Sequence, residues 1–119
     1  MKTKLLLMTL LLAGCSTQPP PMSNAAQDWI DYGQLRAENG WLKQSQSKLT
    51  KLDSDGYLTP ELYMAYENGY EQGRATYCAQ NAYMLGVTGK PYQGICDKLD
   101  PFFQQDYMSG RSSTAGSRL

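Results

Sequence analysis

The chain has 119 residues and a balanced formal charge, with 11 Lys and Arg against 11 Asp and Glu. The basic residues are scattered singly along the chain, which is atypical of a nucleic-acid-binding surface. There is no histidine, so Ser-His or Cys-His nucleophilic catalysis and the usual zinc hydrolase sites are excluded. The sequence also lacks a phosphate-binding glycine loop followed by Lys and Ser or Thr. We therefore expect no nucleic-acid partner, no cofactor and no enzymatic activity.

The N-terminus has the pattern of an export signal. Two lysines precede a run of nine residues, 5–13, of which eight are apolar, and this run is too short to span a bilayer. The next residues complete Leu12-Ala13-Gly14-Cys15, which resembles the bacterial lipobox at every position. The resemblance implies cleavage before Cys15, a diacylglycerol on its thiol and an acyl group on the new amine. The alternative is an ordinary secretory signal followed by an incidental cysteine.

Lipidation would fix both the anchoring and the location of the protein. Several acyl chains on one residue anchor a protein stably, whereas a single chain holds it only marginally. Ser16 stands where lipoproteins retained in the inner membrane of enteric bacteria carry aspartate. By that rule we expect the periplasmic face of the outer membrane. Loss of Lys2 and Lys4 with the signal leaves 9 basic and 11 acidic residues, or a net charge of −2.

Composition divides the chain into four segments. Residues 1–14 are the predicted signal, and residues 15–26, with three consecutive prolines, have the composition of an extended lipidated tether. Residues 27–110 form one small domain. Residues 111–119 are poor in apolar side chains, so we expect a flexible tail.

Two cysteines remain in the predicted domain, Cys78 and Cys96. In an exported protein an even pair indicates a disulfide, and two cysteines allow one intramolecular pairing. A metal site is the weaker alternative, because two thiols without histidine fall short of the usual four zinc ligands. We expect the disulfide to contribute about 3 kcal/mol to the stability of so small a domain.

The region 59–86 has a helical pattern. Thr59 and Pro60 suit the N-cap and the first turn of a helix. Tyrosines recur at steps of three and four, which places Tyr66 and Tyr70 on one face. Gly69 and Gly73 lie four residues apart on the neighbouring stripe. Each glycine costs roughly 1 kcal/mol relative to alanine in a helix, so we expect another backbone to pack closely there.

Similar aromatic and glycine phrases begin a helix at Asp28 that ends near Gly40, and close another that runs from Asp100 to Gly110. The glycine-rich segment 86–96 is predicted to be a loop that returns Cys96 to the central helix. The predicted fold is therefore mostly α, a small bundle of three or four short helices stapled by one disulfide.

The segment KLDSDGYLTPEL, residues 51–62, resembles a calcium-binding loop. In that register Lys51 occupies the first ligand position and Leu62 replaces the bidentate glutamate. We therefore expect Asp53 and Asp55 to serve a turn that ends in a helix cap, with no metal bound.

Paired carboxylates occur at helical spacing, Asp28 with Asp31 and Glu67 with Glu71. Such pairs can perform acid/base chemistry. The more ordinary interpretation is a solvated helix face, with Glu71 close to Arg74.

Together these phrases resemble a family of short proteobacterial lipoproteins classed as a domain of unknown function. The similarity runs from Trp29 to Gly110 and is carried by W-x3-G from Trp29, Y-x2-G-Y-x2-G from Tyr66, YC at Tyr77, and G-x2-G-x2-Y-x-G-x-C ending at Cys96. It implies an envelope lipoprotein without an assigned activity.

Two functions follow as hypotheses. One is a structural or interaction module that docks an envelope protein. The other is a glycan-binding module in which exposed aromatic rings stack on sugars. The two are distinguished by whether four rings are exposed together, namely Tyr66, Tyr70, Tyr92 and Trp41.

Overall fold

The computed structural model describes residues 18–115. Its helices are α1 (Ala26–Glu38), α2 (Gln46–Leu52), α3 (Pro60–Cys78), α4 (Ala82–Val87) and α5 (Phe103–Ala115). The mostly α prediction is confirmed, although these residues form five helices where three or four were expected. The signal and Cys15 lie outside the described residues. Within residues 18–115, no helix is long and apolar enough to cross a membrane.

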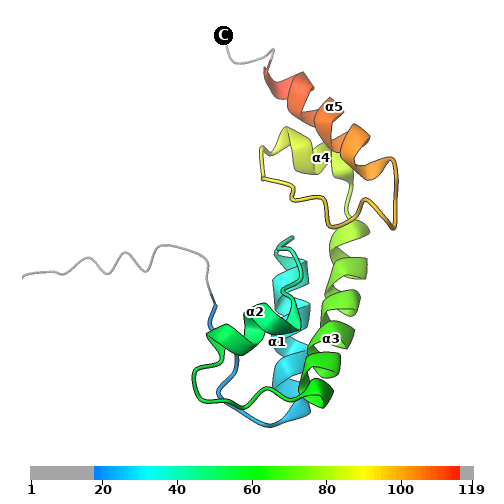
Figure 1. The fold of residues 1–119 in the computed structure, drawn as a ribbon. Coiled ribbons are helices and arrows are strands. Elements are labelled where there is room, and N and C mark those ends of the chain that lie inside the picture. The colour runs from blue at the N-terminus through cyan, green and yellow to red at the C-terminus, as the bar shows by residue number, and fades with distance from the viewer. Residues whose placement is uncertain (1–17, 116–119) are drawn as a thin grey trace, which may run out of the picture.

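The helices form two pairs. Helices α1 and α3 pack side by side, with α2 against them, and we call α1 and α3 the first helix pair. Helices α4 and α5 form the second helix pair at the far end of α3 (Figure 1). The partners of each pair run in the same direction.

Side-chain caps explain where three helices begin. The Thr59 hydroxyl accepts a hydrogen bond from the Leu62 N–H at 3.2 Å, with Pro60 as the first residue of α3. Ser45 caps α2 in the same way. Asn81 caps α4 through the N–H of Met84, at 3.0 Å. Each cap satisfies a backbone donor that the first helical turn leaves free.

Two predicted helix boundaries were wrong. The helical pattern over 59–86 contains two helices, because α3 ends at Cys78 and Asn81 starts a new one. The last helix begins at Phe103 instead of Asp100, and it continues five residues beyond Gly110. The continuation follows from packing, since the backbone around Gly110 lies directly against α4.

The first helix pair crosses at glycines on both partners. A Cβ atom on Gly33 would overlap the carbonyl oxygen of Tyr66, and one on Gly69 would overlap the carbonyl oxygen of Ile30. Gly73 lies in the same way against the Gln34 carbonyl. The backbones therefore touch, and the glycine Cα–H groups face carbonyl oxygens, a contact that recurs at close helix crossings.

The second helix pair repeats this crossing. A Cβ atom on Gly86 would overlap the Tyr107 carbonyl oxygen, and one on Gly110 would overlap that of Tyr83. In each pair two glycines, Gly33 with Gly69 and Gly86 with Gly110, face the carbonyl of the residue three positions before the partner glycine. The fold thus contains one helix-crossing motif twice.

Two hydrophobic cores correspond to the two pairs. The first is built around Trp29, Leu49 and Tyr66, and the second around Tyr77, Cys96 and Phe103. The predicted disulfide is confirmed: Cys78 and Cys96 are bonded at 2.02 Å, with their Cα atoms 5.6 Å apart. It fastens the end of α3 to the loop that leads into α5.

Candidate functional site: the docked segment and its pocket

Residues 18–25 pack against α1, although the sequence predicted a free tether there. The Trp29 indole N–H donates to the Ser23 carbonyl at 2.8 Å, and the indole is fully buried. The Tyr32 hydroxyl lies 3.2 Å from the Gln18 carbonyl oxygen. We call residues 18–25 the docked segment. Two aromatic side chains of one helix therefore hold both ends of this segment.

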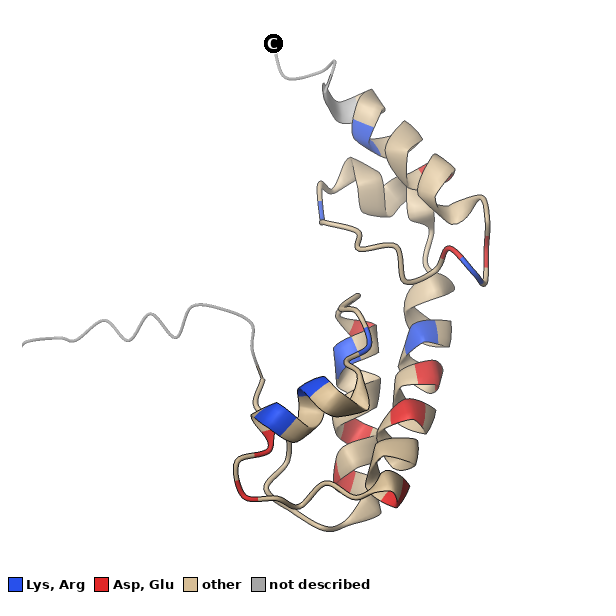
Figure 2. Cartoon of the chain, viewed as in Figure 1, with Lys and Arg blue, Asp and Glu red and all other residues tan. Residues whose placement is uncertain are grey.

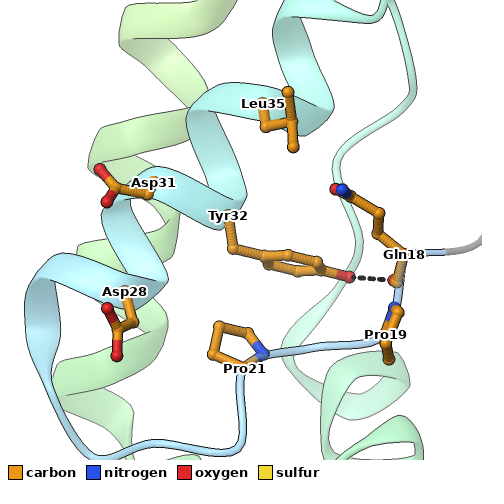
Figure 3. A pocket seen from close by; sticks show the side chains of 7 residues that line it. All are labelled: Gln18, Pro19, Pro21, Asp28, Asp31, Tyr32 and Leu35. Atoms are coloured by element: carbon orange, nitrogen blue, oxygen red, sulfur yellow. Dashed lines mark hydrogen bonds between the residues drawn. The ribbon is translucent and has the colours of Figure 1, made fainter.

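The docked segment and α1 enclose a shallow pocket of about 300 Å³ (Figure 3). Prolines, Leu35 and the ring of Tyr32 make its walls, and the carboxylates of Asp28 and Asp31 project at its edge. The lining residues are Gln18, Pro19, Pro21, Asp28, Asp31, Tyr32 and Leu35.

The paired carboxylates lie on solvated helix faces. Asp28 and Asp31 are exposed, and Asp31 accepts a hydrogen bond from the Gln27 amide at 2.8 Å. The other pair is divided between separate cations, because Glu67 bonds Lys43 at 3.0 Å and Glu71 bonds Arg74. None of these four residues is buried in the way that the acid of a catalytic carboxylate pair is. The arrangement therefore favours the solvated-face interpretation.

A ring of tyrosine hydroxyls surrounds Gln44, which is 5% exposed. Its backbone N–H donates to the Tyr66 hydroxyl at 3.0 Å, and its carbonyl accepts from Tyr63 at 2.9 Å. The Tyr32 hydroxyl lies 3.1 Å from its side-chain oxygen. Tyr70 extends the ring by donating to the Trp41 carbonyl at 2.8 Å. These bonds fasten the segment between α1 and α2 onto α3.

Burial favours the protonated form of the tyrosines around Gln44. Removal from water raises the pKa of Tyr66 to about 12. The same cause raises the pKa of Tyr32, Tyr63 and Tyr70 above 10.0. Burial favours the neutral phenol. These tyrosines are therefore hydrogen-bond donors at neutral pH and are unsuited to act as bases.

The four rings that a sugar platform requires are not exposed together. Tyr66 and Tyr70 are 0% and 3% exposed. Tyr92 and Trp41 are half-buried, Tyr92 against Phe103 with ring centroids 5.0 Å apart and Trp41 beneath Arg36. Tyr66 and Tyr70 contribute to helix packing, on the same helix as Gly69 and Gly73. The stacking surface of the glycan hypothesis is therefore absent among these four residues.

The calcium-like segment has a turn geometry. The Asp53 carboxylate accepts a hydrogen bond from the Leu58 N–H at 2.6 Å, and Gly56 adopts a left-handed φ of 73°. In residues 18–115, no cluster of three potential metal-ligating residues is present. The side chain of Asp53 thus closes the loop between α2 and α3.

Sequence reasoning missed Gln44 and the docked segment as parts of this site. Gln44 is a single polar residue outside any periodic pattern. Ser23 and Trp29 are six residues apart, a spacing that no common capping pattern uses. The prolines indicated an extended backbone, but a free spacer and the docked segment are both extended, so composition did not distinguish them.

Comparison with known proteins gives one significant result. No curated protein and no solved structure matches the chain significantly. A family model described as "Protein of unknown function (DUF2799)" matches residues 28–112. That span includes both helix crossings and the disulfide. The chain therefore belongs to the DUF2799 family.

Proposed function

We propose that the protein is a lipoprotein of the bacterial cell envelope, anchored through Cys15 at the periplasmic face of the outer membrane, and that its domain is an interaction module. The observation that carries the proposal is the complete lipobox Leu12-Ala13-Gly14-Cys15 after a short apolar run. A triacylated cysteine holds a protein at the bilayer without a spanning helix.

The described domain suits a structural or interaction role. Its conspicuous tyrosines form hydrogen bonds that fasten one loop: Tyr66 accepts from the Gln44 N–H and Tyr70 donates to the Trp41 carbonyl. The paired carboxylates lie on solvated faces. A disulfide across a chain of this size is typical of proteins that work in an oxidising compartment. These features support a rigid periplasmic scaffold that presents a surface to an envelope protein.

Mass spectrometry of protein extracted from membranes tests the anchor. The N-terminal peptide should begin at Cys15 and carry the mass of three acyl chains with glycerol. The matched control, Cys15→Ser, should accumulate as an uncleaved and unacylated precursor. A free Cys15 thiol, or a mature chain that begins elsewhere, would overturn the proposal.

The location has a separate test. Membranes separated on a density gradient should contain the wild-type protein in the outer-membrane fraction. Ser16→Asp changes only the residue that follows the lipidated cysteine, so it should move the protein to the inner membrane. If both variants remain in the inner membrane, the outer-membrane assignment is wrong while lipidation stands.

A further inference from the structure

We infer that the domain lies directly against the membrane, with helix α2 turned toward anionic lipid headgroups. The inference rests on the proposed lipid anchor at Cys15 and adds the orientation of the domain and the chemistry of the surface it contacts. Four observations lead to it: the short reach from Cys15, the fixed position of Gln18, the charge of α2, and the opposite charge on α1.

The first observation is the length of chain between the anchor and the domain. If residues 15–26 were a free spacer, the domain could stand roughly 30 Å from the bilayer. However, the Tyr32 hydroxyl holds the Gln18 carbonyl and the Trp29 indole holds the Ser23 carbonyl. Only three residue steps then separate Cys15 from the docked segment, and they span at most about 11 Å. The lipid therefore keeps Gln18 near the headgroups.

The second observation places Gln18 beside α2. The Tyr32 hydroxyl lies 3.2 Å from the Gln18 carbonyl and 3.1 Å from the side-chain oxygen of Gln44. Gln44 directly precedes Ser45, the N-cap of α2. With seven residues, α2 is about 10 Å long. All of α2 consequently lies close to the point where the chain leaves for its anchor.

The third observation is the charge of α2. Lys48 and Lys51 are exposed, and the helix contains no acidic residue (Figure 2). Within the part of the chain that the structure describes, neither lysine forms an ion pair. Leu52, at the end of the helix, is 46% exposed and adds an apolar side chain. Two carboxylates in the turn that follows offset part of this charge: Asp55 is exposed, and Asp53, the C-cap residue, is half-buried and accepts a hydrogen bond from the Leu58 N–H.

The fourth observation orients the domain. Asp28 and Asp31 lie on α1 at the pocket that Gln18 also lines. An anionic surface attracts α2 and repels this edge of α1. Because surface potentials extend about 8 Å at physiological ionic strength, a domain held this close experiences both forces. The domain therefore turns α2 to the bilayer and the two carboxylates away from it.

Lysine footprinting on the full lipidated protein tests this orientation. The protein is reconstituted in vesicles of phosphatidylethanolamine and phosphatidylglycerol, and separately in neutral detergent micelles. Each sample is treated with a small neutral acylating reagent, and labelling is quantified by mass spectrometry. Lys48 and Lys51 should be labelled about five-fold more slowly in the vesicles. Lys90 and Lys98, which are exposed in the loop between α4 and α5, serve as internal controls and should react equally in both samples.

Two variants separate the tether from the charge. An insertion of ten Gly and Ser residues between Thr17 and Gln18 lengthens the reach without altering the domain, so it should abolish most of the protection. Replacing Asp28 and Asp31 by Asn removes the repulsion, so it should reduce the difference in labelling between α2 and the controls. Vesicles of phosphatidylcholine alone should protect Lys48 and Lys51 less than anionic vesicles.

The outcomes distinguish the two proposals. The intact mass of the reconstituted protein reports acylation of Cys15, and an unacylated chain would overturn both proposals. An acylated chain in which Lys48 and Lys51 are labelled at the same rate in vesicles and in micelles, as Lys90 and Lys98 are, would overturn the orientation alone. Protection of Lys90 and Lys98 instead of the α2 lysines would overturn it as well, since the second helix pair would then face the membrane.

Discussion

Each helix pair contains the same glycine-to-carbonyl crossing, but the bonds that stabilise the two pairs differ. In the first pair Gly33 and Gly69 lie against the carbonyls of Tyr66 and Ile30, and in the second pair Gly86 and Gly110 repeat the contact in the same register. In the first pair, tyrosine hydroxyls form hydrogen bonds with Gln44 in the loop between α1 and α2. The second pair also has such a bond, from the Tyr107 hydroxyl to the Lys90 carbonyl, but it differs from the first in its disulfide.

Helix length accounts for the difference. The first pair joins helices of 13 and 19 residues, whereas α4 in the second pair has six. Isolated helices of six residues are unstable, so α4 depends on tertiary contacts and on the loop that follows it. A covalent link that restrains this loop in the unfolded chain supplies stability that a short helix cannot. The cross-link thus accompanies the backbone contact in the pair that contains the six-residue helix α4.

The largest effect should come from filling the crossings. Gly69→Leu and Gly110→Leu each place a side chain against a backbone carbonyl, which only a shift of the helices can relieve. We expect each to lower the free energy of unfolding by about 3 kcal/mol or more. Urea unfolding of a chain of residues 15–119 that carries Cys15→Ser measures the loss.

The adjacent exposed positions provide matched controls for this prediction. Asn68→Leu and Ser109→Leu introduce the same side chain one residue away, on the solvent side of each helix. Both should unfold close to the wild-type midpoint. Equal losses at Asn68 and Gly69 would show that leucine disrupts α3 for reasons other than the crossing.

Removing the disulfide should have the next largest effect. Replacing Cys78 and Cys96 by serine releases a ring with a sequence separation of 18, at a cost of about 3 kcal/mol. For a domain of this size that lowers the Tm by roughly 10 to 20 °C. Thermal unfolding followed by circular dichroism checks the shift. Coincident melting curves for this variant and the wild type, without reductant, would contradict the assigned role.

Strongly alkaline pH should weaken the first pair. The folded pKa of Tyr66 is about 12, above the unfolded value near 10. Because the folded state favours the protonated phenol, its contribution is complete below pH 10 and is lost as the pH rises through 12. Tyr66→Phe removes this titration, so its stability should depend less on pH in that window. The free energy of unfolding is measured by urea unfolding at each pH. If it falls equally for wild type and Tyr66→Phe between pH 10 and pH 12, the prediction is wrong.

The smallest effect should come from the ion pair between Lys43 and Glu67. Its nitrogen and oxygen lie 3.0 Å apart, but both side chains are more than one-third exposed. Exposed pairs contribute up to about 1 kcal/mol, so Glu67→Ala should lower stability by less than Gly69→Leu or the loss of the disulfide does. A loss as large as that of Gly69→Leu would mean that this face of α3 is buried against another element.

Local sequence signals predicted the features that depend on neighbouring residues. Thr59-Pro60 marks the start of α3, and the cysteine pair marks the disulfide. The break at residues 79–81 was missed because this segment contains no proline or glycine that would mark the end of a helix. Helix α2 was missed because only Leu49 in it is buried, so it shows no apolar stripe.

The candidate site was less predictable than the fold. Its parts come from three segments: the prolines before α1, Tyr32 in α1, and Gln44 before α2. Their hydrogen bonds join residues 12 to 22 positions apart through single polar atoms. Composition and periodicity do not encode such contacts, whereas they do encode helix faces and caps.

Native-state hydrogen exchange, with and without reductant, tests the central claim that two like crossings are fastened by different means. Reduction of the Cys78–Cys96 bond should increase the exchange rates of amides in α4 and α5 by about ten-fold or more. Amides of α1 and of the first three turns of α3 should exchange at unchanged rates, because hydrogen bonds hold the loop around Gln44 and a disulfide reductant does not cleave them. Uniform acceleration in all helices, or unchanged protection in α4 and α5, would contradict the account.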